Sequence, residues 1–243
     1  MLGKLKVKYI QSLGQKKLRD AEGVFIAEGP KIISELLSSK NAAIQQIFAL
    51  KEWIDLQTKN RKDIEIVEVS EDELEKISQL ATPNQVLAVV KKFEQPAIIA
   101  KGKVTLVLDT IQDPGNLGTI IRIADWFGVE QIVCSHDCAD MYNSKVVQST
   151  MGSIARIKVL YTDLAPWLSQ QKDLRIYATA LEGQDITALK KLNEGIIVIG
   201  NESKGISEEV MKLANVKITI PKRGKAESLN AAVAAGVILS HLV

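Results

Sequence analysis

The chain contains few of the residue types that mark several common classes of protein. Its 243 residues include two cysteines and two histidines. Cys134 and Cys138 are too few for a disulfide framework, and their spacing differs from that of structural zinc pairs. His136 lies between them, but a strand-like segment precedes it, so we expect reduced thiols and no metal site. Neither His136 nor His241 lies near a Gly-x-Ser-x-Gly motif, which excludes the usual nucleophile elbow.

Long apolar runs and a large excess of one charge are also absent. The apolar runs at residues 104–108 and 195–200 are far shorter than the roughly 20 residues that span a bilayer, and residues 1–20 lack the apolar core of a signal peptide. The net charge is +2 at pH 7, with 46% hydrophobic and 25% charged residues. These values are typical of a globular protein of one or two domains, and we expect it to be cytoplasmic.

Positive charge is nevertheless concentrated at the amino terminus. Lys16, Lys17 and Arg19 belong to a basic cluster in the first twenty residues, where Asp20 is the only acidic residue. Such a cluster suits contacts with phosphate groups. The solvated face of a helix explains the same pattern equally well from charge alone.

The order of the predicted elements divides the chain into two α/β parts. Residues 1–95 mix short helices and strands, residues 96–103 form a linker, and residues 104–243 alternate strands with helices. The strands of the second part are apolar on both faces, which predicts a mostly parallel sheet with helices on both faces. Ser228 is the predicted N-cap of a final apolar helix.

Three short polar segments follow strands of the second part. They are residues 113–118 (Asp-Pro-Gly-Asn-Leu-Gly) with Arg122 beyond them, residues 200–205 (Gly-Asn-Glu-Ser-Lys-Gly), and residues 220–221 (Ile-Pro) followed by residues 228–230 (Ser-Leu-Asn). Open α/β sheets bind their ligands at the carboxyl ends of the strands. The sequence therefore predicts one ligand site built from all three segments.

Two phosphate-binding motifs can be compared with the first segment. A dinucleotide-binding domain requires Gly-x-Gly-x-x-Gly and a carboxylate about 20 residues later, at the end of the second strand. Residues 114–118 (Pro-Gly-Asn-Leu-Gly) do not have this glycine spacing, and the predicted second strand ends at Cys134 and Ser135. A Walker loop requires Gly-Lys-Ser/Thr, which does not follow either. An NAD-dependent dehydrogenase is therefore a remote alternative.

Together the three segments resemble the signature motifs of the SpoU (TrmH) family in the SPOUT superfamily. Members of that family are S-adenosylmethionine-dependent RNA ribose 2′-O-methyltransferases. Residues 16–29 and 82–89 are also similar to the family's N-terminal substrate-binding domain. The resemblance implies an RNA-binding domain of ribosomal-protein type at residues 1–95 and a methyltransferase domain at residues 104–243. It also implies that the carboxy-terminal segment forms a deep trefoil knot, a rare exception to the rule against threaded chains.

The resemblance assigns roles to individual residues. It implies that Arg122 is catalytic and that Asn116, Glu202, Ser228 and Asn230 form the polar shell around it. The implied contacts of S-adenosylmethionine are Thr179, Ala180, Leu181, Gly200, Asn201, Gly205, Ile220 and Leu229. The implied RNA contacts are Lys16, Lys17, Arg19 and Lys145, and no metal is required.

Three of these residues have simpler explanations that the sequence leaves open. Arg122 could form a surface ion pair with Asp125, Glu202 could cap backbone amides near Gly205, and Lys145 could be a solvated lysine. Arg122 is a poor general base because a guanidinium with a pKa above about 12 stays charged. We expect it to bind a phosphate and to stabilise the developing alkoxide.

The composition of the last helix indicates the oligomeric state of the protein. Residues 231–236 (Ala-Ala-Val-Ala-Ala-Gly) depart from the valine and small residue that the family commonly has there. The final helix is apolar nearly all round, which suits burial against a second subunit, and the resemblance implies a homodimer.

The appended first domain favours ribosomal RNA over transfer RNA as substrate. The alternatives are a transfer RNA methyltransferase and a non-catalytic RNA-binding or ribosome-assembly protein.

Overall fold

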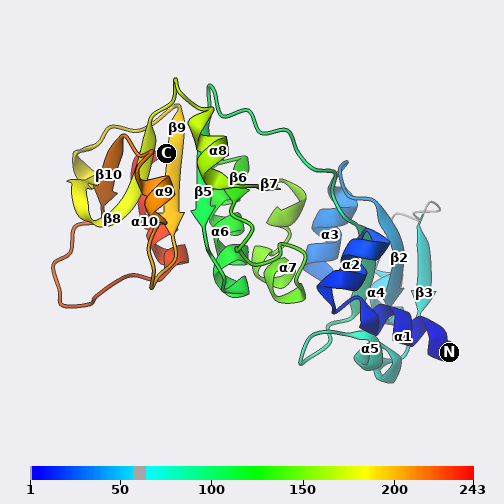
Figure 1. Cartoon of the computed structure of the whole chain (residues 1–243). Coiled ribbons are helices and arrows are strands. Elements are labelled where there is room, and N and C mark those ends of the chain that lie inside the picture. Colours follow the sequence, from blue (N-terminus) through cyan, green and yellow to red (C-terminus); the bar gives the residue numbers. More distant parts are fainter. Residues whose placement is uncertain (1, 57–63) are drawn as a thin grey trace. The chain divides into compact units, whose positions relative to one another are not determined.

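The computed structural model describes residues 2–56 and 64–243 (Figure 1). The chain forms two compact units. The first comprises Met1–Glu94 with Tyr142–Ala155, and the second comprises Gln95–Met141 with Arg156–Val243. The segment Tyr142–Ala155 thus packs with the first unit, although its place in the sequence is within the second part.

The first unit is built on a four-stranded sheet with the strand order β1-β4-β2-β3. Its strands are β1 (Val24–Glu28), β2 (Ile44–Ala49), β3 (Glu65–Glu68) and β4 (Val86–Lys91). Strand β4 is antiparallel to β1 and β2, whereas β2 and β3 are parallel. The helices of this unit are α1 (Lys4–Ser12), α2 (Lys16–Glu22), α3 (Pro30–Ser38), α4 (Lys51–Asp55), α5 (Glu71–Ile77), α7 (Ser144–Thr150) and the 3-10 helix η1 (Ser153–Ala155).

Side chains on the two faces of this sheet are buried by different helices, because successive residues of a strand point to opposite faces. Phe48, Leu87 and Val89 form one core with residues of α1 and α5. On β1, Phe25 faces the segment that carries α7, and its ring lies 4.9 Å from that of Tyr142. That aromatic contact accounts for part of the packing of Tyr142–Ala155 in this unit.

The second unit contains a six-stranded sheet with the order β10-β8-β9-β5-β6-β7. All five neighbouring pairs of strands are parallel, as the sequence predicted. The strands are β5 (Val104–Asp109), β6 (Gln131–Cys134), β7 (Lys158–Tyr161), β8 (Ile176–Asp185), β9 (Gly195–Gly200) and β10 (Val216–Thr219). The helices are α6 (Pro114–Trp126), α8 (Leu164–Ser169), the 3-10 helix η2 (Ile186–Ala188), α9 (Glu208–Met211) and α10 (Ala231–Leu242).

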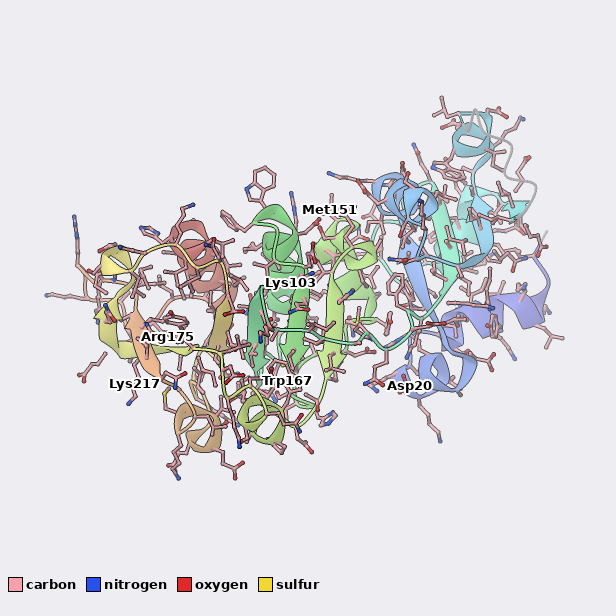
Figure 2. All side chains as sticks on the ribbon, turned by 90° about the horizontal axis from the view of Figure 1, so that it is seen from above. Asp20, Lys103, Met151, Trp167, Arg175 and Lys217 are labelled. Atoms are coloured by element: carbon pink, nitrogen blue, oxygen red, sulfur yellow. The ribbon has the colours of Figure 1, made fainter. Side chains whose placement is uncertain are left out.

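Helices cover both faces of this sheet. Val107, Val133 and Val198 belong to a core that includes residues of α8 and α9. Helices α6 and α10 pack together and α10 contacts β9, so these two helices cover the opposite face. Figure 2 draws the described side chains and labels Arg175, just before β8, and Lys217 on β10.

Two boundaries differ from the sequence prediction. Helix α10 begins at Ala231, and its N-cap is Asn230, whose side chain accepts hydrogen bonds from the backbone N–H groups of Ala232 and Val233. The prediction that Ser228 caps this helix is therefore wrong. Asn and Ser are comparable N-caps, so residue type alone could not choose between the two positions. The mostly apolar segment at residues 175–180 predicts a strand of that length, whereas strand β8 continues to Asp185.

Candidate active site

The site lies where the strand order of the second sheet reverses direction. From β5 the chain continues to β6 and β7 on one side, while β9, β8 and β10 lie on the other. The last residues of β5 and β9, Asp109 and Gly200, are register partners. The segments that follow them therefore start side by side, at the kind of position where open α/β sheets bind ligands.

Hydrogen bonds join all three predicted motifs through their side chains. The Asn116 side-chain amide donates to Glu202 Oε1. The Asn230 Nδ2 group donates to Asn116 Oδ1 at 2.9 Å. Glu202 Oε1 also accepts from the backbone N–H of Ala231 at 3.4 Å. We call Asn116, Glu202 and Asn230 the polar node.

The polar node lies at the amino-terminal ends of two helices. Asn116 is in the first turn of α6, whose N-cap Asp113 accepts from the Asn116 backbone N–H at 2.8 Å, and Asn230 is the N-cap of α10. A carboxylate is favourable at a helix amino terminus because the exposed N–H groups carry partial positive charge. Glu202 therefore stabilises the start of α10 while it orients Asn116.

The segment 200–205 is held by its own backbone and by Asn201. Asn201 and Gly205 exchange two backbone hydrogen bonds of 3.0 and 2.9 Å. The Asn201 side chain accepts from the N–H groups of Ser203 and Lys204 and donates to the Thr110 carbonyl at 3.0 Å. The backbone-capping role that was an alternative for Glu202 thus belongs to Asn201, because the Glu202 carboxylate points to Asn116 and Ala231.

A glycine is required at position 200 because the backbone there passes very close to the backbone of Gly205 and Ile206. A Cβ atom at this position would lie 2.3 Å from the Gly205 carbonyl carbon and 2.5 Å from the Ile206 nitrogen. Backbone atoms cannot rotate away as a flexible side chain can. Any larger residue at position 200 must therefore open the turn.

A second layer of contacts supports Thr110, which the sequence analysis did not single out. Thr110 has a φ of 61°, and its backbone N–H donates to Ser135 Oγ at 2.9 Å. Asp109 is buried and accepts from the Ser207 N–H at 2.8 Å and from the Thr110 hydroxyl at 3.0 Å. A β-branched residue rarely adopts a positive φ, so the surrounding hydrogen bonds hold this conformation. Nothing in the sequence marks a positive φ at a threonine.

The two cysteines lie beneath the same turn. Cys138 Sγ accepts from the Ile111 backbone N–H at 3.2 Å. A hydrogen bond from the Cys134 thiol is the main cause that lowers the pKa of Cys138 to about 7, against the opposing effect of burial. The same interaction, together with burial, raises the pKa of Cys134. Both thiols are free, and they help to position the chain that leads from β5 into α6.

Arg122 lies on α6, six residues beyond Asn116, and its side chain is exposed. Among the residues that the structure describes, it has no hydrogen-bond or ion-pair partner. The alternative pairing with Asp125 is wrong, because Asp125 instead pairs with Arg156, whose Nη2 lies 2.7 Å from Asp125 Oδ2. The guanidinium of Arg122 is therefore available to bind an anion.

The predicted cofactor segments lie in or directly after three neighbouring strands, β8, β9 and β10. The register between β8 and β10 shifts after Lys217, which pairs with Ala178, to Ile218, which pairs with Gln184. Residues 179–183, which include Thr179, Ala180 and Leu181, therefore bulge out of the ladder. Gly200 is the last residue of β9, Asn201 and Gly205 follow it, and Ile220 and Leu229 follow β10. The Thr219 hydroxyl donates to the Leu181 carbonyl at 3.1 Å and links two of the segments.

These segments have the composition that an adenine-containing ligand requires. Leu181 and Leu229 are 79% and 46% exposed at this edge of the sheet, and residues 221–230 are exposed throughout. Apolar walls combined with accessible backbone groups suit a flat heteroaromatic ring. The residues present therefore fit S-adenosylmethionine.

The remaining predicted site residues are not brought into the polar node. Ser228 is exposed and has no hydrogen bond among the residues described. Lys17 and Lys145 are exposed, and Lys16 forms an exposed pair with Asp20 at 2.8 Å. Arg19 differs from these lysines because it is 3% exposed and donates from Nη1 to the carbonyls of Leu13 and Gly14 at 3.0 and 2.8 Å. Its guanidinium holds the turn between α1 and α2 and is buried there, which does not agree with the predicted RNA contact.

Comparison with known proteins agrees with this geometry. Residues 103–240 match the SpoU rRNA Methylase family, and residues 4–88 match the MRM3-like substrate binding domain. The chain belongs to the SpoU rRNA Methylase family. The resemblance that the three motifs predicted is thereby confirmed, and the match covers the whole polar node.

Relatives of this SpoU-family chain are similar over nearly its full length. The 23S rRNA (guanosine(2553)-2′-O)-methyltransferase RlmP of Bacillus subtilis is 31% identical over 98% of this chain and 95% of its own. The AdoMet-bound structure of an rRNA methyltransferase from Sinorhizobium meliloti has a TM-score of 0.87 at 30% identity, covering 99% of this chain and 95% of the other. A TrmH-family protein from Porphyromonas gingivalis has a TM-score of 0.88 at 32% identity, covering 99% and 98%.

Two structural observations concern membrane-spanning helices and metal sites. No helix within residues 2–56 and 64–243 is long and apolar enough to cross a bilayer. In the same part of the chain, no group of three or more histidine, cysteine, aspartate or glutamate side chains is arranged to hold a metal ion.

Proposed function

We propose that this protein transfers a methyl group from S-adenosylmethionine to a ribose 2′-hydroxyl of ribosomal RNA. The polar node carries the proposal, because it joins the three SpoU motifs at the switch point of a parallel sheet. The RlmP relative, named for 23S rRNA, supports ribosomal RNA as the substrate. We also propose that the reaction takes place in the cytoplasm, where a bacterial ribosomal RNA would be met.

The residues that would hold the cofactor are those of segments 179–181, 200–205 and 220–229. When bound there, S-adenosylmethionine supplies an electrophilic methyl group on a sulfonium. Gly200 and Gly205 keep the turn after β9 narrow, and Leu181 and Leu229 offer apolar surface. Well-oriented reactants can gain roughly 7 to 11 kcal/mol, so positioning by these segments is their main contribution.

Arg122 is the proposed catalytic residue of this chain. Its exposed, unpaired guanidinium is suited to bind a substrate phosphate and to stabilise negative charge on the 2′-oxygen. A guanidinium has hydrogen-bond donors and no acceptor, so Arg122 is not assigned the role of accepting the 2′-hydroxyl proton. Asn116, Glu202 and Asn230 hold the start of α6 and so position the helix that carries Arg122.

We propose that the first unit binds the RNA substrate. Its match to the MRM3-like substrate binding domain supports this role, as do the exposed Lys17 and Lys145. Lys16 and Lys17 begin α2, and Lys145 lies in the first turn of α7. Lysines on helix surfaces bind phosphate as mobile point charges, so we expect them to add affinity without base preference.

The proposal includes a homodimer formed by helices α6 and α10. These helices pack together, and they carry the exposed Trp126 (83%) and Val233 (52%). Large exposed apolar side chains can mark interaction surfaces. We further infer the knot implied by the motifs, which is supported by the return of the chain from edge strand β10 to α10 beside β9. Tracing the chain in an electron-density map of a crystal would test the threading.

The experiment that tests the activity measures tritium transfer from labelled S-adenosylmethionine to total ribosomal RNA. We expect incorporation by the wild-type protein and a loss of at least a hundredfold for Arg122→Ala, since removal of one charge-stabilising group costs about 10²–10³ in rate. The matched control is Arg175→Ala, because Arg175 is also exposed but precedes β8, at the opposite edge of the sheet. No incorporation by the wild type, or equal incorporation by Arg122→Ala, would contradict the proposal.

A further inference from the structure

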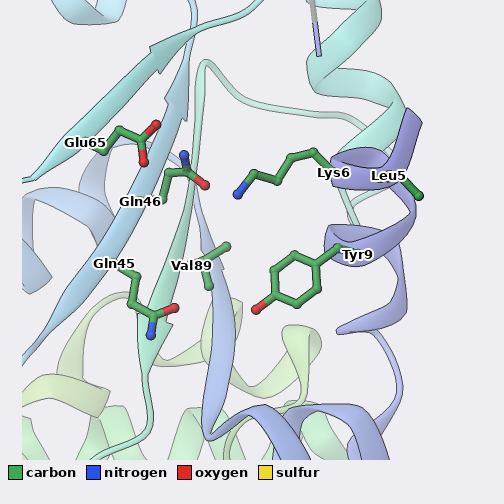
Figure 3. Close-up of a pocket in the computed structure, with 7 residues that line it drawn as sticks. All are labelled: Leu5, Lys6, Tyr9, Gln45, Gln46, Glu65 and Val89. Atoms are coloured by element: carbon green, nitrogen blue, oxygen red, sulfur yellow. The ribbon is translucent and has the colours of Figure 1, made fainter. Parts of the chain in front are cut away.

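The first unit contains a cavity of about 580 Å³ between helix α1 and the sheet. Figure 3 shows the side chains around it. They come from α1 (Leu5, Lys6, Tyr9), from β2 (Gln45, Gln46), from β3 (Glu65) and from β4 (Val89). Of these side chains, only those of Leu5 and Val89 are purely apolar.

The floor of the cavity is one row of residues across three strands. Gln46 is the register partner of Val89 on β4 and of Glu65 on β3. Register partners point to the same face, so all three side chains face α1. The register of β2 against β4 shifts between Ile44 and Gln46, which makes Gln45 the extra residue of a β-bulge. Bulges re-aim side chains, and this bulge allows two adjacent glutamines to line one cavity.

Gln46 is the residue that points to a ligand. It is only 8% exposed, and its side-chain amide has no hydrogen-bond partner among the residues that the structure describes. Figure 3 shows this amide on the sheet side of the cavity, with the Lys6 side chain extending toward it from α1. The Gln46 amide atoms are not among the fully buried polar atoms that lack a partner, so the amide reaches into the cavity and can form hydrogen bonds with a ligand there. Two positions further along β2, on the same face, the fully buried Phe48 belongs to the apolar core.

The other walls provide an aromatic ring and two opposite charges. Tyr9 lines the cavity, and burial with the nearby charge of Glu22 raises its pKa, so its phenol is neutral at physiological pH. The Lys6 ammonium lies 5.9 Å from the centroid of the Tyr9 ring. Neither Lys6 nor Glu65 has an ion-pair partner among the described residues. Both charges are therefore available to a ligand.

We propose that this cavity binds an unpaired guanine base of the RNA substrate. A carboxylate only accepts hydrogen bonds, and guanine alone among the four bases presents two adjacent donors, N1–H and N2–H, to the Glu65 oxygens. The Gln46 amide then donates to O6, the Tyr9 ring stacks on the base, and Lys6 contacts the neighbouring phosphate. Recognition of splayed single-stranded bases by stacking and by Watson–Crick edges is how proteins read RNA sequence. This inference rests on the proposed function for the identity of the polymer.

Binding of short RNAs to the full-length protein tests the pocket directly. Fluorescence anisotropy would compare labelled pentaribonucleotides that carry guanosine, adenosine or inosine between uridines. We expect the guanosine RNA to bind about tenfold to a hundredfold more tightly than the adenosine RNA, with inosine between them because it lacks the N2 amine. Equal affinity for all three would overturn the proposal. Competition by free guanosine monophosphate as strong as that by the RNA would also overturn it, because the pocket would then serve a nucleotide.

Two variants separate recognition from folding. Glu65→Gln should abolish the preference for guanosine, whereas the matched Glu68→Gln, which is exposed on the other face of β3, should leave it unchanged. Gln46→Leu should weaken binding of the guanosine RNA about tenfold while its Tm stays equal to or above that of the wild type, because the Gln46 amide forms no hydrogen bond to the described residues that the variant would lose. A fall in Tm for Gln46→Leu, or a retained preference in Glu65→Gln, would contradict the assignment.

The same experiment distinguishes failure of the pocket from failure of the proposed activity. Arg122→Ala should retain the guanosine preference, because Arg122 lies in the second unit and the cavity lies in the first. A wild-type protein that methylates ribosomal RNA but binds the three RNAs equally would refute the pocket alone. A protein that prefers guanosine but transfers no methyl group would refute the activity alone.

Discussion

The side-chain amide of Asn230 donates to Asn116 Oδ1 at 2.9 Å, although 114 residues separate them in the chain. Each of the two residues lies at the start of a helix, α10 and α6 respectively. Their hydrogen bond therefore fixes the amino-terminal ends of both helices at one point, where Glu202 joins them. The position of Arg122 on α6 depends on this junction.

Replacing Asn116 by aspartate should destabilise the second unit. The variant Asn116→Asp places a carboxylate against Glu202, and like charges raise the pKa of one member of such a pair. A carboxyl group whose pKa is raised by folding stabilises the folded state at pH values below its pKa in the unfolded chain, which is about 4. This stabilisation is lost as the pH rises through its pKa in the folded protein. We expect a loss of about 1–3 kcal/mol in the free energy of unfolding near pH 8, which shrinks toward pH 4. Urea denaturation measures it, and Asn193→Asp, at an exposed loop position, should show no such dependence.

Replacing Gly200 by alanine should abolish cofactor binding. The added Cβ would lie 2.3 to 2.5 Å from backbone atoms of Gly205 and Ile206, so the turn after β9 must open. Isothermal titration with S-adenosylmethionine measures the effect, and we expect at least a hundredfold weaker binding. The control is Gly3→Ala, because a Cβ at Gly3 meets no atom within 4 Å and Gly3 lies in the first unit, outside the cofactor segments. Wild-type affinity in Gly200→Ala would show that this turn does not shape the cofactor site.

Replacing Glu28 by glutamine should remove a pH dependence of stability. Burial raises the pKa of Glu28 above its ordinary value of 4.5, against the opposing effect of hydrogen bonds from Ser78 and Gln79. The contribution of this group to stability is therefore present below pH 4.5 and is lost as pH rises through the raised value. Relative to Glu28→Gln, the wild type should lose stability in urea titrations as the pH rises above about 4.5. Glu68→Gln is the control, and a difference that grows in the wild type's favour as pH rises would contradict this sign.

Replacing Trp126 by glutamate should weaken the proposed dimer. Trp126 is 83% exposed at the end of α6, and burial of a tryptophan at an interface covers roughly 150–250 Å². A charge at this position would have to be desolvated in the dimer, so we expect dimerisation to be at least tenfold weaker by sedimentation. Ile99→Glu is the matched control, because Ile99 is 67% exposed and lies outside both helices. Unchanged sedimentation of Trp126→Glu would place the interface elsewhere or exclude it.

The sequence predicted most of the second unit because its signals are local. Strands that are apolar on both faces predicted a parallel sheet, and the polar residues after β5, β9 and β10 predicted where its ligand edge lies. The N-cap of α10 was misplaced because Ser228 and Asn230 are both good N-caps, and only the backbone conformation distinguishes them. Arg19 was assigned to RNA by its charge, and its burial could not be read from the adjacent lysines.

The sequence by itself determined the family and the chemistry, since motif residues such as Asn116, Arg122 and Glu202 keep their identity and order whatever the fold. Only the tertiary structure decided which of them meet. It joined Asn116 to Asn230, left Arg122 unpaired because Asp125 binds Arg156, and aligned Gln46 with Glu65 across two strands. Contacts between residues distant in the chain depend on strand order and register, and neither is encoded in any single segment.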